Sequence, residues 1–448
     1  MANYILVFVL LLVNCVSFAM NQDSLQGASS AADVRLRVSN FNQTVMPRVN
    51  RYSHGDAMRV GMPSGQLDPD HDLMFDRDNR TEARDLFVQP LNVNDLGTCA
   101  SSGYMARVLA ISGGGVRGIG PADMCASIEG RSMKPLANSV NLFAGTSTGA
   151  IISTALTMKN PETSEPLYPA NNIVRLYQEE CDNIFQRRTW LGYLLKSKYK
   201  TTPAYETFAR YFGDTKLSEI RDDADLLIPH YNLTNNHIDF FKSHKAKDPL
   251  LAQYNDFYLK DVIASTTAAP MYFRPFKLQS VYTQEHHGRD YIYSIDGGVV
   301  ANDPSTCALT EAMSLYHNAN SFLVVSMGTG SCCVELSPNG LLGWAKDIST
   351  ILMNNTSEMY GHMLKKFGQY TSRPVFYSRL QFTVSPEHAA MDDISRGNLT
   401  YLQHQVQSDN GISSKIATLS QVFRESDKPS REVLTNGGAN IPSMFLEI

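Results

Sequence analysis

A serine stands between two glycines in the segment NLFAGTSTGA, residues 141–150. Ser147 lies midway between Gly145 and Gly149, after an apolar stretch and before an apolar, helix-compatible run that continues to Met158. The pattern predicts a strand that turns sharply into a helix, with both glycines at places where a Cβ would clash. The serine hydroxyl then stands at the amino end of the helix, where free N–H groups favour negative charge. This is the layout of a hydrolase nucleophile, and its alternative is a glycine-lined helix start with a capping serine.

A nucleophilic serine needs hydrogen-bond donors for the oxyanion that it creates. The short apolar strand predicted at 108–112 ends in a triple glycine, Gly113, Gly114 and Gly115, before a helix begins. Backbone N–H groups exposed by such a turn are suited to hold an oxyanion. A phosphate-binding loop is the competing interpretation, but the turn lacks the Lys-Ser/Thr ending of that loop.

The same serine needs an acceptor for its proton. The strand predicted at 291–295 ends in Asp296, which two glycines follow. A carboxylate in this position is exposed to the site, and the glycines allow another backbone or a substrate to approach closely. The alternative is an ordinary turn aspartate.

These residues require strands that bring them to one edge of a sheet. Strands are predicted at 108–112, 140–144, 225–233, 291–295, 322–327 and 376–382. Helical patterns lie between most of them, and Asp303 with Pro304 is expected to cap and begin one helix. The alternation predicts an α/β fold with a mostly parallel sheet covered on both faces and active groups at the carboxyl ends of the strands.

Composition excludes several classes of protein. The chain has 448 residues, 43% of them hydrophobic and 19% charged, with a net charge of -5. It is therefore globular, and the modest negative charge without a polybasic block argues against nucleic acid as a partner. No cysteine pair has the spacing of a zinc site, while disulfides and buried free thiols both remain open.

The amino-terminal region is expected to direct export of the protein, and its first 19 residues are expected to be cleaved off. Residues 1–19 contain an uncharged apolar run and end in small residues, which is typical of a secretory signal peptide. The alternative, a membrane anchor, needs a longer apolar run of about 20 residues. Residues 20–102 form a polar leader without an assigned role. The mature protein is expected to be secreted, periplasmic or extracellular, with at most peripheral membrane contact.

Three motifs in this order, GGGVRG, GTSTG and DGG, resemble those of the patatin-like phospholipases. Segments 214–217, 263–270, 326–330 and 391–394 also resemble landmarks of that family. The resemblance covers about Arg107 to Phe423 and implies a three-layer α/β/α patatin-like domain within 103–448. It implies that Ser147 is the nucleophile and Asp296 the general base, without a metal or cofactor. It also implies an oxyanion loop formed by Gly113, Gly114, Gly115, Val116, Arg117 and Gly118, in which Arg117 supports the loop or meets lipid phosphate.

The resemblance further implies a function. The expected activity is that of a lipid acyl hydrolase of the phospholipase A type, which releases fatty acid from membrane glycerolipids through an acyl-serine intermediate. Its partner is a phospholipid or related glycerolipid at a membrane surface, and the sequence indicates no protein partner. The aromatic and basic insertion at 187–200 is a candidate for lipid contact, with core aromatics beside a solvated basic face as the alternative.

Three other functions remain open at this point. A Ser-His-Asp esterase requires a histidine beyond the acid, and His317, His362, His388 and His404 all follow Asp296. A lipid-binding or storage protein would keep the fold without useful turnover. Acyl transfer to another alcohol would use the same acyl-serine.

Overall fold

A computed structural model describes residues 104–187, 197–332, 359–364, 366 and 373–435. The expected signal peptide (1–19) and polar leader (20–102) lie outside these residues, as does most of the insertion at 187–200. Within the described ranges, no helix is long and apolar enough to cross a lipid bilayer.

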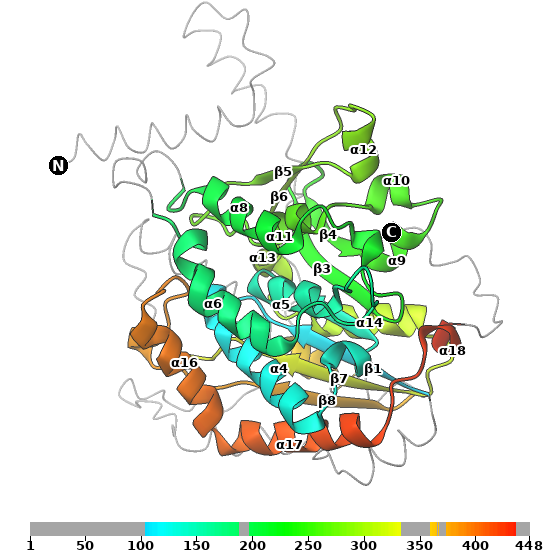
Figure 1. Cartoon of the computed structure of the whole chain (residues 1–448), viewed down its shortest axis with the longest axis vertical. Helices are drawn as coiled ribbons and strands as arrows, with labels where there is room; N and C mark the ends of the chain where they lie inside the picture. The colour runs from blue at the N-terminus through cyan, green and yellow to red at the C-terminus, as the bar shows by residue number, and fades with distance from the viewer. Residues whose placement is uncertain (1–103, 188–196, 333–358, 365, 367–372, 436–448) are drawn as a thin grey trace, which may run out of the picture. The chain divides into compact units, whose positions relative to one another are not determined.

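The centre of the fold is a sheet of mostly parallel strands (Figure 1). In chain order the strands are β1 (Met105–Ile111), β2 (Leu142–Gly145), β3 (Asp225–Asn232), β4 (His237–Lys242), β5 (Phe276–Leu278), β6 (Ile292–Asp296), β7 (Ser321–Met327) and β8 (Val375–Leu380). Their order across the sheet is β5-β6-β3-β2-β1-β7-β8, and β4 also pairs with β3. The run from β3 to β8 is parallel, whereas β4, β5 and β6 pair antiparallel with their neighbours.

Helices lie in most of the connections between the strands and also follow the last strand. They are α4 (Ile119–Ser132), α5 (Thr148–Thr157), α6 (Ala170–Ile184), α8 (Thr201–Phe212), α9 (Ser243–Lys247), α10 (Ala252–Asn255), α11 (Leu259–Thr266), α12 (Val281–Glu285), α13 (Gly298–Ala301), α14 (Ser305–Leu315), α16 (Arg396–Ser408), α17 (Asn410–Glu425) and α18 (Arg431–Thr435). Among them, α4, α16 and α17 pack together at the lower left of Figure 1.

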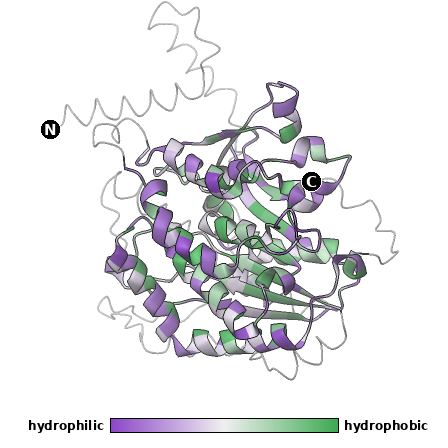
Figure 2. Cartoon of the chain, viewed as in Figure 1, coloured by the Kyte–Doolittle hydropathy of each residue, from purple (hydrophilic) through white to green (hydrophobic). Residues whose placement is uncertain are grey.

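Alternate residues of β1 enter two different cores. Leu109 and Ile111 pack with residues of α4, α5, α6, α8, α11, α16 and α17. Val108 and Ala110 pack on the opposite side with residues of α14. All seven residues of this strand are buried, as expected for a central parallel strand covered on both faces. Figure 2 shows the strands mainly hydrophobic and α6 and α16 mainly hydrophilic on their outer surfaces. The predicted three-layer α/β/α architecture is confirmed.

Two strands and one helix start differ from the sequence-based prediction. The sequence did not indicate β4, whose side chains are mostly half-exposed, or β5, which has only three residues. Helix α14 begins at Ser305, so Pro304 lies at its N-cap rather than in its first turn. Asp303 still receives the Ser305 N–H at 3.0 Å, and its fully buried carboxylate also pairs with Arg379 at 2.8 Å.

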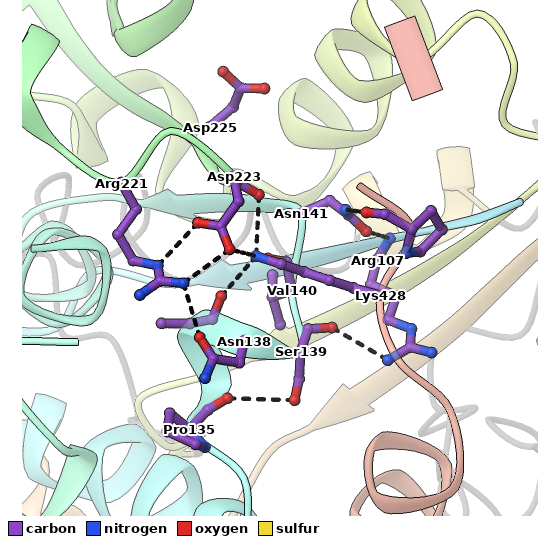
Figure 3. Close-up of polar contacts among 12 residues, drawn as sticks. Arg107, Pro135, Asn138, Ser139, Val140, Asn141, Arg221, Asp223, Asp225 and Lys428 are labelled. Atoms are coloured by element: carbon purple, nitrogen blue, oxygen red, sulfur yellow. Dashed lines mark hydrogen bonds and ion pairs between the residues drawn. The ribbon is translucent and has the colours of Figure 1, made fainter. Parts of the chain in front are cut away.

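The carboxyl-terminal segment is held across the amino ends of the parallel strands by buried cations (Figure 3). The ammonium of Lys428 donates to the carbonyl oxygens of Ala137 (2.7 Å), Val140 (3.0 Å) and Asp223 (3.0 Å). It also lies 3.1 Å from the Asp223 carboxylate, and only 7% of its side chain is exposed. One ammonium therefore satisfies oxygens from the segments that lead into β2 and β3.

The Arg107 guanidinium anchors the same segment from β1. It donates to the carbonyl oxygens of Ser426 and Asp427, each at 3.2 Å, and lies 5.5 Å from the centre of the Phe423 ring. These contacts lie at the end of the sheet opposite to the strand ends that carry Ser147 and Asp296, so they stabilise the fold without touching those residues.

We predict that Lys428→Met lowers the free energy of unfolding by about 3 kcal/mol, because three carbonyl oxygens and a carboxylate lose their common, largely buried donor. Urea denaturation measures the loss. The matched control is Lys134→Met, whose partner Asp427 is 91% exposed and which should cost about 1 kcal/mol or less. Equal losses in the two variants would contradict the structural role given to Lys428.

Candidate active site

Ser147 lies at a sharp turn between β2 and α5. Its backbone has φ 53° and ψ -119°, in a region that a residue with a side chain adopts only under strain. Its N–H donates to the Thr266 hydroxyl at 3.2 Å, and that hydroxyl donates to the Pro229 carbonyl at 2.8 Å. The turn is therefore held from the neighbouring strand β3 and from helix α11, which offsets part of the backbone strain.

The two glycines flanking Ser147 are required by backbone contacts. A Cβ on Gly145 would lie 2.2 Å from the carbonyl oxygen of Gly149. A Cβ on Gly149 would lie 2.2 Å from the carbonyl oxygen of Ile111 at the end of β1. Both obstacles are main-chain atoms, which cannot move aside as a flexible side chain does. The clash predicted from the sequence is confirmed at both positions.

Asp296 lies near the same turn because three strands, β2, β4 and β6, all pair with β3. Strand β4 occupies one edge of β3, so β2 and β6 must follow one another along its other edge. Strand β2 pairs with residues 225–227 of β3, and β6 pairs with residues 230–232 in the opposite direction. The carboxyl end of β6, Asp296, therefore faces the carboxyl end of β2, where Ser147 begins the next helix. An antiparallel strand delivers this carboxylate, which a purely parallel arrangement would not.

Asp296 is completely buried. Burial raises its pKa to about 6, although the Ser147 hydroxyl and the Gly298 N–H, at 2.7 Å from Oδ1, both act to lower it. Ser147 is thus close enough to affect the pKa of the carboxyl, yet Oδ2 of Asp296 has no hydrogen bond of normal geometry. We regard the two groups as neighbours in loose contact, a common state of catalytic pairs before substrate binds. Oδ2 is left as an unoccupied proton acceptor.

Half of the backbone amides in the predicted oxyanion loop already donate hydrogen bonds within the protein. Three of its amides donate to carbonyl oxygens: Gly113 to Asn302 at 3.0 Å, Val116 to Met391 at 2.9 Å, and Arg117 to Gly114 at 3.2 Å. The Gly113 carbonyl in turn accepts from the Thr329 hydroxyl at 2.7 Å. These bonds fix the loop, and they remove the three amides from direct contact with an oxyanion.

Two glycine amides of the loop remain available. Among the described residues, no hydrogen bond uses the N–H of Gly114 or Gly115, nor that of Thr148 at the start of α5. Gly115 has φ 59°, and a Cβ on it would lie 2.1 Å from the Met391 carbonyl oxygen. The loop therefore needs glycine for its shape, and it leaves donors beside Ser147.

Arg117 lies within the short 3-10 helix Gly115–Gly118 that follows these donors. It is 5% exposed, and burial lowers its pKa to about 10, so it remains a cation at neutral pH. Arg117 and Gly118 are not among the described residues that line the pocket around Ser147. A Cβ on Gly118 would lie 2.2 Å from the Thr148 hydroxyl, so this glycine allows the loop to pack on α5.

Ser147, Asp296 and Gly115 line one pocket of about 820 Å³, counting the space that opens to solvent. Its walls come mainly from α5, α6, α8, α11 and the segment that follows α11, and they are largely apolar. The apolar and aromatic lining residues are Ile151, Tyr177, Cys181, Ile184, Phe185, Ala204, Tyr205, Phe208, Ala264, Ala268, Ala269, Tyr272, Phe273 and Met391.

No histidine is among the described residues that line this pocket. Of the four histidines downstream of Asp296, His388 stacks on Tyr401 and lies 2.9 Å from the Asn398 side chain. His230, which the sequence did not single out, pairs across the strands with Asp296. Its ring stacks on Phe241 and its Nδ1 lies 2.8 Å from the Ser294 hydroxyl, while burial lowers its pKa to about 4. The geometry therefore favours a carboxylate over an imidazole as the partner of Ser147.

The sequence missed three residues that hold the site. Thr266, Thr329 and Met391 lie in segments 263–270, 326–330 and 391–394, which the sequence marks only as landmarks. Their roles arise from contacts with residues far away along the chain, which no local pattern reveals.

Of the insertion at 187–200, Tyr199 is fully buried against Phe185 and Phe273, so this aromatic belongs to the core.

We predict that Gly149→Ala slows labelling of Ser147 by a fluorophosphonate at least about 100-fold, because the turn must shift away from β1. Packing strain should also lower the free energy of unfolding by roughly 1–3 kcal/mol. The control is Gly130→Ala in α4, where a Cβ meets no atom within 4 Å and should stabilise the helix slightly. Wild-type labelling and stability in Gly149→Ala would show that the close approach to Ile111 is not a constraint.

Comparison with known proteins agrees with this architecture. The family model described as patatin-like phospholipase matches residues 109–309. Patatin-like protein 2 of Arabidopsis thaliana is 30% identical over 58% of this chain and 71% of its own length. Patatin-like protein 4 of the same plant is 29% identical over 67% of this chain and 82% of its own.

Patatin group J-1 of Solanum tuberosum is 29% identical over 68% of this chain and 84% of its own. Among solved structures, that of VipD from Legionella pneumophila covers 67% of each chain at 13% identity and a TM-score of 0.27, too low to bear on the fold. The matches to the family and to these plant relatives show that the chain belongs to the patatin-like phospholipase family.

Proposed function

We propose that this protein hydrolyses fatty acyl esters of membrane glycerolipids, with Ser147 as nucleophile and Asp296 as general base. Membership of the patatin-like phospholipase family indicates lipid acyl hydrolase activity at the level of the family. The observation that carries the finer assignment is the meeting of a strained Ser147 and a buried Asp296 in one largely apolar pocket.

The first step is attack on the acyl carbonyl. Because the pKa of Asp296 is about 6, its carboxyl is ionised at neutral pH, and its free Oδ2 accepts the proton of Ser147. The Ser147 oxygen forms a bond to the carbonyl carbon, and the electron pair of the carbonyl moves to its oxygen. The amides of Gly114 and Gly115, with that of Thr148 at the helix start, then stabilise the oxyanion. Each such donor contributes about 3 kcal/mol in the transition state.

The remaining steps return the protein to its starting state. When the tetrahedral intermediate collapses, the bond to the glycerol oxygen breaks and that oxygen takes the proton from Asp296. The deacylated lipid leaves and the acyl group stays on Ser147. Asp296 next removes a proton from water, whose oxygen attacks the acyl carbon, and the released Ser147 oxygen recovers that proton as the fatty acid departs.

The pocket wall is suited to the acyl chain rather than to a polar head group. The side chains contributed by α6, α8 and α11 are mainly aliphatic or aromatic, and burying a methylene against them contributes about 0.8 kcal/mol. We infer that the fatty acyl chain occupies this wall while the head group remains toward the membrane surface. Export of the protein and its peripheral contact with membranes remain part of the proposal and rest on residues 1–19 and on the expected lipid substrate.

We predict that purified protein releases free fatty acid from mixed phospholipid and galactolipid vesicles, as measured by mass spectrometry of the lipids. Ser147→Ala and Asp296→Asn should reduce turnover by at least about 1,000-fold, because each removes one member of a unit that acts together. A fluorophosphonate should label the wild-type protein and leave Ser147→Ala unlabelled.

The histidines provide the matched controls. Substitution of His317, His362, His388 or His404 by Gln should change turnover less than about threefold, since no proton passes through them. Loss of turnover in one folded histidine variant would favour a Ser-His-Asp esterase. Identical lipid profiles for the wild type and Ser147→Ala would contradict the hydrolase and favour a lipid-binding or storage protein. Acyl esters of a new alcohol among the products would instead show acyl transfer.

A further inference from the structure

A two-residue segment, Met391 and Asp392, lies between the oxyanion loop and the pocket wall. The Met391 carbonyl accepts the Val116 N–H at 2.9 Å. Its oxygen would lie only 2.1 Å from a Cβ placed on Gly115. Since Gly115 carries one of the available oxyanion donors, the position of this carbonyl sets the position of the donor. Met391 also lines the pocket.

The next residue, Asp392, is anchored on the other side of the pocket. Only 8% of this residue is exposed. Its Oδ2 accepts a hydrogen bond from the Lys198 ammonium and another, at 2.5 Å, from the Tyr199 hydroxyl. Burial alone would raise the pKa of Asp392, but the bonds from Lys198 and Tyr199 outweigh burial and hold its pKa below the usual value. Asp392 is therefore a carboxylate at neutral pH.

Lys198 and Tyr199 lie behind the pocket wall and are bonded to the segment that forms it. Their N–H groups donate to the carbonyl oxygens of Met271 at 3.0 Å and Tyr272 at 2.9 Å. The Tyr199 ring is fully buried, and the Phe273 ring, which lines the pocket, lies 5.7 Å away. An uninterrupted chain of contacts thus runs from the wall through Asp392 to Met391 and the oxyanion loop.

We propose that Asp392 is a positioning residue that clamps the Met391 carbonyl against the oxyanion loop and so fixes the oxyanion donors relative to Ser147. The inference rests on the proposed function, because it assigns a role within that reaction. Asp392 itself does not touch Ser147 or Asp296, and it exchanges no proton with substrate. Its effect is geometric, and a displacement of about 1 Å in a catalytic group costs up to 100-fold in rate.

The test compares Asp392→Ala and Asp392→Asn with Asp393→Asn. Asp393 is the adjacent carboxylate, and its Oδ1 accepts the Ser395 N–H at 3.1 Å on the side of α16. Asp393→Asn removes the same charge from the same loop and keeps an acceptor for that N–H, so it should behave as wild type.

Three readouts separate positioning from general stability. With a soluble short-chain ester, Asp392→Ala should lower kcat by 10- to 100-fold and change KM by less than about threefold, since the lost interaction acts in the transition state. The rate of fluorophosphonate labelling of folded protein should fall by the same factor. The acid limb of the pH–rate profile should stay where it is in the wild type, because the base is untouched. Asp392→Asn should show a smaller loss than Asp392→Ala.

A second variant keeps the test decisive if Asp392→Ala does not fold. Tyr199→Phe keeps the buried ring and removes only the hydroxyl that holds Oδ2 of Asp392, and it should slow labelling about three- to tenfold. Combined with Asp392→Asn, it should add less than the product of the two single effects, because both act through one contact.

The outcomes distinguish failure of this inference from failure of the proposed function. If the wild-type protein is labelled at Ser147 and folded Asp392→Ala or Tyr199→Phe is labelled at the same rate, Asp392 is not a positioning residue. A shared loss in Asp393→Asn would likewise overturn the inference, since it would reflect the loop rather than the clamp. If wild-type protein is not labelled at all, the proposed function itself fails.

Discussion

The proposed chemistry depends on one buried pair, the hydroxyl of Ser147 and the carboxylate of Asp296. A free aspartate is too weak a base to accept a serine proton at useful rates, since its ordinary pKa is near 3.9. Complete burial raises the pKa of Asp296 to about 6, so the carboxyl is still ionised at neutral pH but holds a proton more readily. An acid of this strength is suited to take a proton from the nucleophile and return it to the leaving group. In the proposed function, the apolar pocket that would receive an acyl chain is therefore also the environment that raises the pKa of this carboxyl.

The sheet creates this pair through its departure from a purely parallel arrangement. Strand β2 ends at the turn that carries Ser147, and β6 arrives from the opposite direction along the same edge of β3 and ends at Asp296. Thr266 ties the turn after β2 to β3, since its hydroxyl accepts from the Ser147 N–H and donates to the Pro229 carbonyl of β3. The close approach of Gly149 to Ile111 then fixes the turn against β1, beside the oxyanion loop. The groups proposed as oxyanion donors, nucleophile and base thus come from the ends of neighbouring strands.

Local sequence is sufficient to predict the parts of the site that depend on glycine. Gly145 and Gly149 are predictable because only glycine fits where two backbones approach closely. The triple glycine before Val116 marks a turn by its local sequence alone. The prediction for Asp296 rests on its place at a strand end and on the two glycines that follow it. The short or half-exposed strands β4 and β5 gave no such pattern, so the antiparallel edge that delivers Asp296 was not foreseen. The supports provided by Thr266, Met391 and Asp392 also depend on contacts between distant segments, which spacing along the chain does not encode. The expected signal peptide and leader lie outside the described residues and stay predictions.

The central claim, that a buried carboxylate and no histidine activates Ser147, is tested most directly by the pH dependence of acylation in single turnovers. Because the base must be ionised, the acylation rate should be constant above about pH 7 and fall tenfold per pH unit below the pKa of about 6. This fall in the acylation rate at low pH should be unchanged when any downstream histidine is replaced. It should be absent from the residual rate of Asp296→Asn. A low-pH fall that disappears when one histidine is replaced, or that persists in Asp296→Asn, would contradict the account.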